Sequence, residues 1–248
     1  MPVRQRLEEQ GRWLFRWRSY LPLLVLPILI PTLRNSESLE RAAGSSAQNF
    51  WEIFCFGISL VGLGIRCVTV GHVPAGTSGR NTKGQKAATL NTTGMYSIVR
   101  HPVYLGNLII TLGLVLFVGV WWFFLIVLLA FWLYYERIIL AEEVFLQAKF
   151  GSSYLDWAEK TSGFLPRFKN WQRPSLLFSV RSVLRREYST IFLIVVCANL
   201  LDAGADLMAE GKLELDLGWL ALLIIASIAY LTLRTMKKKT AMLNVAGR

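Results

Sequence analysis

The sequence predicts an all-α integral membrane protein with about six transmembrane helices. Three observations lead to this fold class. Hydrophobic residues make up 54% of the 248 positions, only 17% are charged, and several apolar runs approach the length that crosses a bilayer. Because a spanning helix needs about 20 predominantly apolar residues, we expect each of these runs to form a membrane helix.

The first expected span is short and rich in proline. Residues 20–33 carry Pro22, Pro27 and Pro31, yet with the aromatic flank that begins at Trp13 we expect them to cross the bilayer. Residues 12–18 alternate arginine with aromatic residues, which is typical of a segment at the membrane interface. No small-residue cleavage site follows, so we expect this segment to remain in the mature protein.

The second expected span, residues 50–70, carries Gly57, Gly62 and Gly64. Such small residues allow another helix to pack closely. Arg66 lies near the end of this span. We expect its long side chain to snorkel toward the headgroups.

Residues 103–135 are too long for one span and predict two antiparallel helices that turn near Gly119. Two further spans are expected at 190–208 and 217–233. Asp202 and Asp206 interrupt the first of these. They could contact a polar headgroup, cap a lateral entrance or face water near the outer surface, and we favour the last because that end is weakly apolar.

Lysine and arginine are distributed unevenly among the connecting segments. Residues 1–19 carry five, 71–102 four, 141–188 eight and 234–248 five, whereas 34–49 carry two and 209–214 one. An excess of these residues marks the cytoplasmic side of a membrane protein. The sequence therefore predicts a multi-pass protein with both termini and the two long polar segments, 71–102 and 141–188, on the cytoplasmic side.

Polar residues that could carry chemistry follow the second span. Residues 71–93 are rich in Gly, Thr, Asn and Lys and are expected to form a loop. Pro102 suits the first turn of a helix and disfavours helix at the preceding residue, so Arg100 and His101 are expected at a helix entrance. Tyr104 brings an aromatic ring near the histidine. Taken alone, a polar loop is more often a solvated connector than a site. A lone histidine at an interface is likewise more often structural than catalytic.

A second polar group follows the expected hairpin and contains Glu136, Arg137, Glu142 and Glu143. At about 100° per residue, Glu136 and Glu143 lie within about 20° of each other, as do Tyr135 and Glu142. Adjacent glutamates therefore face different sides, and one can face a site while the other pairs with a base or with water. Ordinary ion pairs at a helix exit are the structural alternative.

Several functions lack support in the sequence. His72 is the only other histidine, and Cys55, Cys67 and Cys197 are far apart, so neither a metal site nor a disulfide framework is expected. Motifs for serine hydrolysis, nucleotide hydrolysis and hydride transfer do not occur. The net charge of +11 accompanies apolar segments without a recognition module, so we expect contact with anionic lipid, not nucleic acid.

Two stretches carry a more specific signal. Arg100-His101-Pro102-Val103-Tyr104-Leu105-Gly106 follows the pattern RHPxYxG, and residues 142–154 follow EExxLxxxFGxxY. With the expected hairpin between them, they resemble the isoprenylcysteine carboxyl methyltransferase and phospholipid methyltransferase superfamily over roughly residues 88–168. The pattern is strongly specific for the superfamily and weakly specific for the substrate.

The resemblance implies that S-adenosylmethionine is bound in a cytoplasmic pocket without a Rossmann domain. The residues that match the family's cofactor pocket are Thr89, Leu90, Asn91, Tyr96, His101, Pro102, Val103, Tyr104 and Glu142. Carboxyl methyltransferases of the family carry a substrate-binding arginine one turn before that glutamate. Here Ile138 occupies that position and Arg137 precedes it, about 100° around the helix. The candidate catalytic residues are Arg137, Glu142 and, as the alternative cation, Arg100.

We expect three regions: N-terminal transmembrane helices at 1–70, a methyltransferase core with the hairpin at 71–170, and a C-terminal extension with two spans at 171–248. The expected function is methylation of a lipid or lipidated acceptor, first at an anionic group such as a prenylcysteine carboxylate or lipid phosphate. The amine of phosphatidylethanolamine is the second acceptor, and a non-catalytic membrane scaffold is the alternative. The bilayer is an expected partner, metal is not, and the oligomeric state is not predicted.

Overall fold

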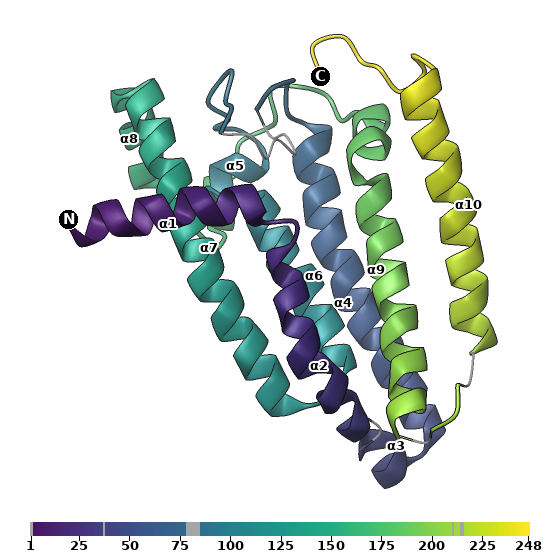
Figure 1. Ribbon diagram of the computed structural model, residues 1–248. Helices are drawn as coiled ribbons and strands as arrows, with labels where there is room; N and C mark the ends of the chain where they lie inside the picture. The colour runs from purple at the N-terminus through teal and green to yellow at the C-terminus, as the bar shows by residue number, and fades with distance from the viewer. Residues whose placement is uncertain (1, 37, 78–84, 210, 214–215) are drawn as a thin grey trace.

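The computed structural model describes residues 2–36, 38–77, 85–209, 211–213 and 216–248, and its regular elements there are all helices. They are α1 (Val3–Trp17), α2 (Leu26–Thr32), α3 (Ser38–Ala43), α4 (Ser45–Gly71), α5 (Met95–Ile98), α6 (Pro102–Phe117), α7 (Trp121–Phe150), α8 (Ser152–Lys160), α9 (Val180–Ala209) and α10 (Leu217–Lys239), with 3-10 turns at Leu21–Val25, Leu33–Asn35 and Phe168–Asn170. The long helices form a bundle (Figure 1). The all-α fold class is confirmed, without a Rossmann-like sheet in the described residues.

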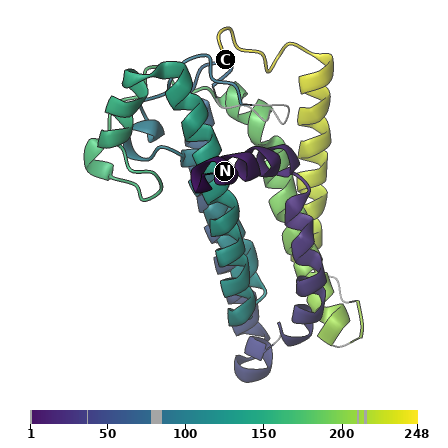
Figure 2. The ribbon, with the colours of Figure 1, turned by 60° about the vertical axis from the view of Figure 1, so that its left-hand side comes forward.

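Within the described residues, four helices, or five if one bent pair is counted as a single span, are long and apolar enough to cross a membrane, compared with the six spans expected. Helices α4, α7, α9 and α10 are long and apolar enough by themselves, whereas α6 has 16 residues. The expected first span forms α2 between two 3-10 turns, with Pro31 inside the helix. It bends by 94° from α1, and the pair counts as at most a fifth span. The flank from Trp13 therefore does not lengthen this span, because α1 runs across the bundle (Figure 2).

Helices α6 and α7 form the expected hairpin, and Gly119 in its turn adopts a φ of 70°, which L side chains rarely adopt. Helix α6 also packs closely on α4. A Cβ atom at Gly62 would lie 2.6 Å from the carbonyl oxygen of Gly106. At Gly57 and Gly64 such an atom would have no neighbour within 4 Å, so these two glycines do not form the packing face that the sequence suggested.

Arg66 does not snorkel, contrary to the sequence-based expectation. It is 8% exposed, and its Nε and Nη2 atoms donate to Glu187 of α9 at 2.9 and 2.8 Å. A buried guanidinium needs a paired carboxylate. Here the carboxylate lies 121 residues away in the sequence, so the pattern of α4 alone could not reveal it.

The two ends of the bundle differ. Helices α5 and α8 and the C-terminus lie at one end, whereas α3 and the turn between α6 and α7 lie at the other (Figure 1). The described parts of the segments that follow α4, α7 and α10 also lie at the first end (Figure 1). Both halves of the sequence motif therefore share that end. Its cytoplasmic orientation, and the three-region division of the chain, stay predictions.

Candidate active site

The entrance of α6 forms the first wall of the site. Pro102 occupies the first turn of the helix and His101 is its N-cap residue, as the sequence predicted. The backbone N–H of Arg100 donates to the carbonyl oxygen of Ser162 at 2.8 Å. This bond ties the entrance to the segment that follows α8. The backbone that presents Arg100 and His101 is thus held by the segment after α8 as well as by its place at the start of α6.

Two adjacent glutamates of α7 meet this entrance. Oε1 of Glu143 lies 3.1 Å from both Nη1 of Arg100 and Nε2 of His101. On the other side of the ring, Nδ1 of His101 lies 3.8 Å from Oε2 of Glu142. The histidine is 6% exposed and stands between the two carboxylates. The prediction that the adjacent glutamates face different sides is confirmed.

An aromatic cluster adjoins the Glu142 side. The ring of Tyr104 stacks on His101, with centroids 5.8 Å apart and planes at 14°. Tyr96 and Tyr104 both interact electrostatically with Glu142, and Asn91 interacts with the hydroxyl of Tyr96. Burial, and then the negative charge of Glu142, raise the pKa of Tyr96 above its ordinary value. This phenol therefore stays neutral near pH 7.

Glu142 has an oxygen to offer a bound molecule. Its Oε2 atom is buried and makes no hydrogen bond within the part of the chain that the structure describes. Buried polar atoms normally have a partner. A carboxylate oxygen beside aromatic rings suits a ligand that carries hydroxyl or ammonium donors and an aromatic base, and S-adenosylmethionine carries all three. The residues at this site thus fit the cofactor that the resemblance implies.

The structure brings together most of the residues that the sequence assigned to the cofactor. Asn91, Tyr96, His101, Pro102, Tyr104 and Glu142 lie at or beside the cluster. Val103 is half-buried in the first turn of α6. Thr89 is exposed and Leu90 half-buried in the loop that leads to Asn91, and the contacts above do not involve them.

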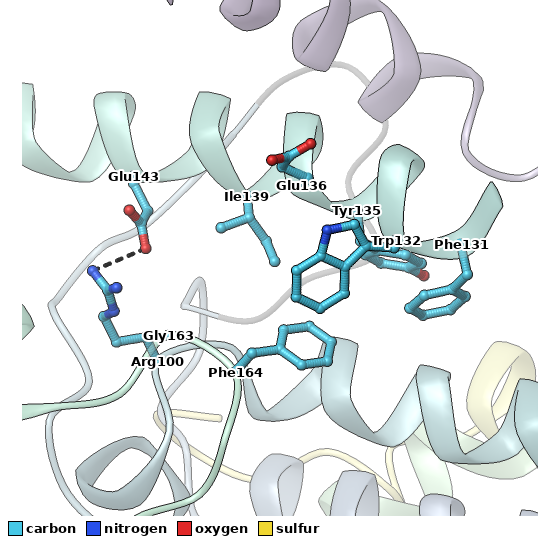
Figure 3. A pocket seen from close by; sticks show the side chains of 9 residues that line it. All are labelled: Arg100, Phe131, Trp132, Tyr135, Glu136, Ile139, Glu143, Gly163 and Phe164. Atoms are coloured by element: carbon cyan, nitrogen blue, oxygen red, sulfur yellow. Dashed lines mark ion pairs between the residues drawn. The ribbon is translucent and has the colours of Figure 1, made fainter. Parts of the chain in front are cut away.

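A pocket opens on the Glu143 side (Figure 3). Its lining comes from α7, the α6 entrance and the segment after α8, namely Arg100, Phe131, Trp132, Tyr135, Glu136, Ile139, Glu143, Gly163 and Phe164. The ion pair of Arg100 and Glu143 lies at one end, and the aromatic rings lie at the other (Figure 3). Trp132 is 54% exposed on a helix long enough to span a membrane, so the aromatic end borders the surface that lipid would cover. Such a pocket fits an amphiphile.

Arg137 does not line this pocket. Its Nε donates to Oε1 of Gln10 in α1 at 3.0 Å, and its Nη1 donates to the carbonyl oxygen of Leu133 at 2.8 Å. Helix α7 is continuous here and does not redirect the side chain. The arginine that the structure places in the pocket is Arg100.

The aromatic half of the pocket was absent from the sequence prediction. A signal existed in α7, because Trp132, Glu136, Ile139 and Glu143 recur at spacings of three and four residues on one helical face. No comparable signal marks Phe164, which reaches the pocket from outside the helix.

Tyr154 of α8 is a further buried residue near the ion pair, with 3% of its surface exposed. Burial, and then the charge of Glu143, raise its pKa to about 12. The phenol therefore stays neutral beside Arg100 and Glu143. Its place in the pattern EExxLxxxFGxxY made it visible in the sequence, but its proximity to this ion pair was not predicted.

Residues 53–153 match the model of the phospholipid methyltransferase family. The match includes the α6 entrance, the hairpin and both glutamates, whose geometry is given above. This stretch of the chain resembles a phospholipid methyltransferase domain. The matched stretch runs from within α4 to the start of α8 and leaves α9 and α10 outside.

Three curated proteins are similar to parts of the chain. The protein-S-isoprenylcysteine O-methyltransferase of Schizosaccharomyces pombe is 34% identical over 85 residues, which cover 34% of this chain and 36% of that protein. The cobalt-zinc-cadmium resistance protein CzcN of Cupriavidus metallidurans is 34% identical over 113 residues, 46% of this chain and 50% of its own length. The nickel-cobalt-cadmium resistance protein NccN of Alcaligenes xylosoxydans xylosoxydans is 30% identical over 125 residues, 50% of this chain and 58% of its own. No solved structure matches the chain.

Proposed function

We propose that the protein is an S-adenosylmethionine-dependent membrane methyltransferase that methylates an anionic group of a lipid or lipidated acceptor. The observation that carries this proposal is the position of His101 between Glu142 and Glu143. On one side lies the cluster that fits the cofactor, and on the other lies the amphiphilic pocket. Two ligands bound at these places would meet beside the histidine.

On the cofactor side, the chain supplies one carboxylate and several rings. Glu142 would accept hydrogen bonds from the cofactor, with Tyr96, His101 and Tyr104 beside it. When bound, S-adenosylmethionine supplies a methyl group activated by a sulfonium charge. Aromatic faces favour both a cation and a stacked base, so these rings suit both parts of the cofactor.

On the acceptor side, Arg100 would position the anion. Its Nη1 is held by Glu143, and its Nε is buried without a hydrogen-bond partner among the described residues. A carboxylate or phosphate is already ionised near pH 7 and needs no general base. The protein then has to align the anion with the methyl group and to exclude water. An acyl or prenyl chain packed on Trp132 and Phe164 would exclude water from the approach.

A lipid amine is the second candidate acceptor, and Glu136 is the observation that favours it. This carboxylate lines the pocket with 58% of its side chain exposed. The lining of the pocket thus carries two acids, Glu136 and Glu143, and one arginine, while Glu136 also pairs with Arg137 outside the lining at 3.5 Å. An ammonium group would be attracted there but would have to lose a proton before it could attack, so we rank it second.

Two relatives are named for metal resistance, and the proposal takes no metal role from them. Within the described ranges, no group of three or more His, Cys, Asp or Glu side chains could hold a metal ion. The family match and the geometry around His101 support the methyltransferase proposal instead.

Incubation of the purified protein with methyl-labelled S-adenosylmethionine and a panel of membrane lipids and prenylcysteine analogues tests this function. We expect mass spectrometry to locate the label on a carboxylate or phosphate of the acceptor. Label found solely on a lipid amine would replace the anionic acceptor by the second candidate. No label on any acceptor, with a protein that stays folded in detergent, would favour the non-catalytic scaffold.

A further inference from the structure

A buried ion pair joins α9, which lies outside the stretch that matches the phospholipid methyltransferase family, to helices inside it. Arg66 of α4 and Glu187 of α9 are 8% and 4% exposed and share hydrogen bonds of 2.9 and 2.8 Å. The hydroxyl of Thr190 donates to Oε2 of Glu187 at 2.7 Å. Three donors therefore fix the carboxylate in one orientation.

The contacts continue from Arg66 to the pocket. Its Nη1 donates to Oδ1 of Asn107 in α6, and Nδ2 of Asn107 donates to the hydroxyl of Tyr135 in α7 at 2.9 Å. Tyr135 lines the pocket, and its ring centroid lies 4.9 Å from that of Tyr104. A single chain of polar contacts thus leads from α9 through α4 and α6 to the pocket wall.

The direction of this chain is determined by donor chemistry. A guanidinium only donates, so Arg66 must meet the amide oxygen of Asn107. The amide nitrogen then points to Tyr135, whose oxygen has to accept. Without Arg66 the amide of Asn107 could turn over, and the Tyr135 hydroxyl would then donate to the amide oxygen, so the direction of this hydrogen bond and the orientation of the hydroxyl would no longer be fixed.

The packing of α9 on α4 does not by itself explain the buried ion pair of Arg66 and Glu187. A buried ion pair is often no more stabilising than apolar side chains of similar volume, so the attachment of α9 to α4 does not require it. Fully satisfied buried polar networks do, however, favour one arrangement over others. Because this network ends at Tyr135, the arrangement that it favours is the one in which Tyr135 lies in the pocket wall.

We propose that Glu187 is a positioning residue, which fixes Arg66 and, through Asn107, holds Tyr135 in the wall of the acceptor pocket. The C-terminal extension then belongs to the catalytic unit and is not an appendage to residues 53–153. The activity arm of the test below rests on the proposed function, whereas the spectroscopic arm does not.

The double variant Arg66→Met with Glu187→Met removes the pair without leaving a buried charge, so we expect it to fold with a melting temperature near that of the unmodified protein. Asn107→Leu breaks the chain of contacts at its middle, and Arg181→Met, at an exposed position on α9, is the control. We expect the first two changes to lower kcat/KM for the acceptor about tenfold through misplacement of the pocket wall. The affinity for S-adenosylmethionine should stay within about twofold of the unmodified value.

Fluorine NMR of 3-fluorotyrosine at position 135 reports the hydrogen bond without any reaction. We expect its resonance to shift in the same direction in the double variant and in Asn107→Leu, and to stay unchanged in Arg181→Met. An unchanged resonance in the double variant overturns the proposal, as does an equal loss of cofactor affinity and acceptor kcat/KM. If the resonance shifts but the unmodified protein methylates no acceptor, the proposed function fails and the positioning of Tyr135 by Glu187 stands.

Discussion

Oε1 of Glu143 lies 3.1 Å from Nε2 of His101, although 42 residues separate the two in the sequence. This contact closes the hairpin of α6 and α7 at the end that carries the site. Because the next residue on a helix is turned by about 100°, Glu142 is set against the other side of the same histidine. The aromatic cluster beside Glu142 and the pocket beside Glu143 therefore adjoin successive residues of α7.

Mutation distinguishes the two candidate acceptor-binding cations, Arg100 and Arg137. Arg100→Gln should lower kcat/KM for an anionic acceptor at least about tenfold, because it removes a charged hydrogen-bond donor from the pocket. Arg137→Gln is the matched control, since this guanidinium bonds Gln10 of α1. Steady-state kinetics measures the loss of kcat/KM in each variant. A larger loss for Arg137→Gln would return the role to that residue.

The rings of Trp132 and Phe164 meet edge to face, with centroids 5.7 Å apart and planes at 65°. Truncating either ring to alanine should raise KM for acceptors with a long chain about tenfold, because the chain loses buried apolar contact. Acceptors whose chain is removed should be little affected. Trp121→Ala, at a residue 74% exposed at the other end of α7, serves as the control. Equal effects on long and short acceptors would contradict a chain-binding role.

Gly62 and Gly64 differ in what a side chain would meet. Gly62→Ala should destabilise the protein by about 1–3 kcal/mol, because its Cβ would press on α6. Gly64→Ala meets open space and should leave stability unchanged or raise it by up to about 1 kcal/mol through helix propensity. Thermal unfolding in detergent measures both. The reverse order would show that α4 and α6 do not pack as described.

Tyr154 should make the protein less stable at high pH. With a folded pKa of about 12 and an unfolded pKa near 10, the unfolded chain releases this proton first. Stability from the neutral phenol is present below about pH 10 and falls toward about pH 12, with a slope of up to about 1.4 kcal/mol per pH unit. Unfolding of Tyr154→Phe in this window should show a shallower decline. An identical slope would mean that Tyr154 is not held neutral by burial.

The features that sequence predicted correctly are local ones. The apolar runs, the hairpin turn at Gly119 and the helix start at Pro102 depend on residues close in the chain. The different directions of Glu142 and Glu143 on the helix follow from helical periodicity alone.

The features that sequence did not reveal depend on distant partners. Arg66 is buried because Glu187 lies beside it, and Arg137 is directed to α1 because the side-chain oxygen of Gln10 accepts a hydrogen bond from it. Phe164 joins the pocket only through the path of the segment after α8. None of these contacts follows from the periodicity of a single helix.

Equilibrium binding of S-adenosylmethionine to the detergent-purified protein tests the central claim, that the residues around Glu142 hold this cofactor. The unmodified protein should bind it, and Glu142→Gln should weaken binding at least about tenfold, because a charged hydrogen-bond acceptor is lost. Glu159→Gln makes the same change at an exposed residue of α8 and should bind as the unmodified protein does. Absence of binding by the folded unmodified protein, or equal binding by Glu142→Gln, would contradict the claim.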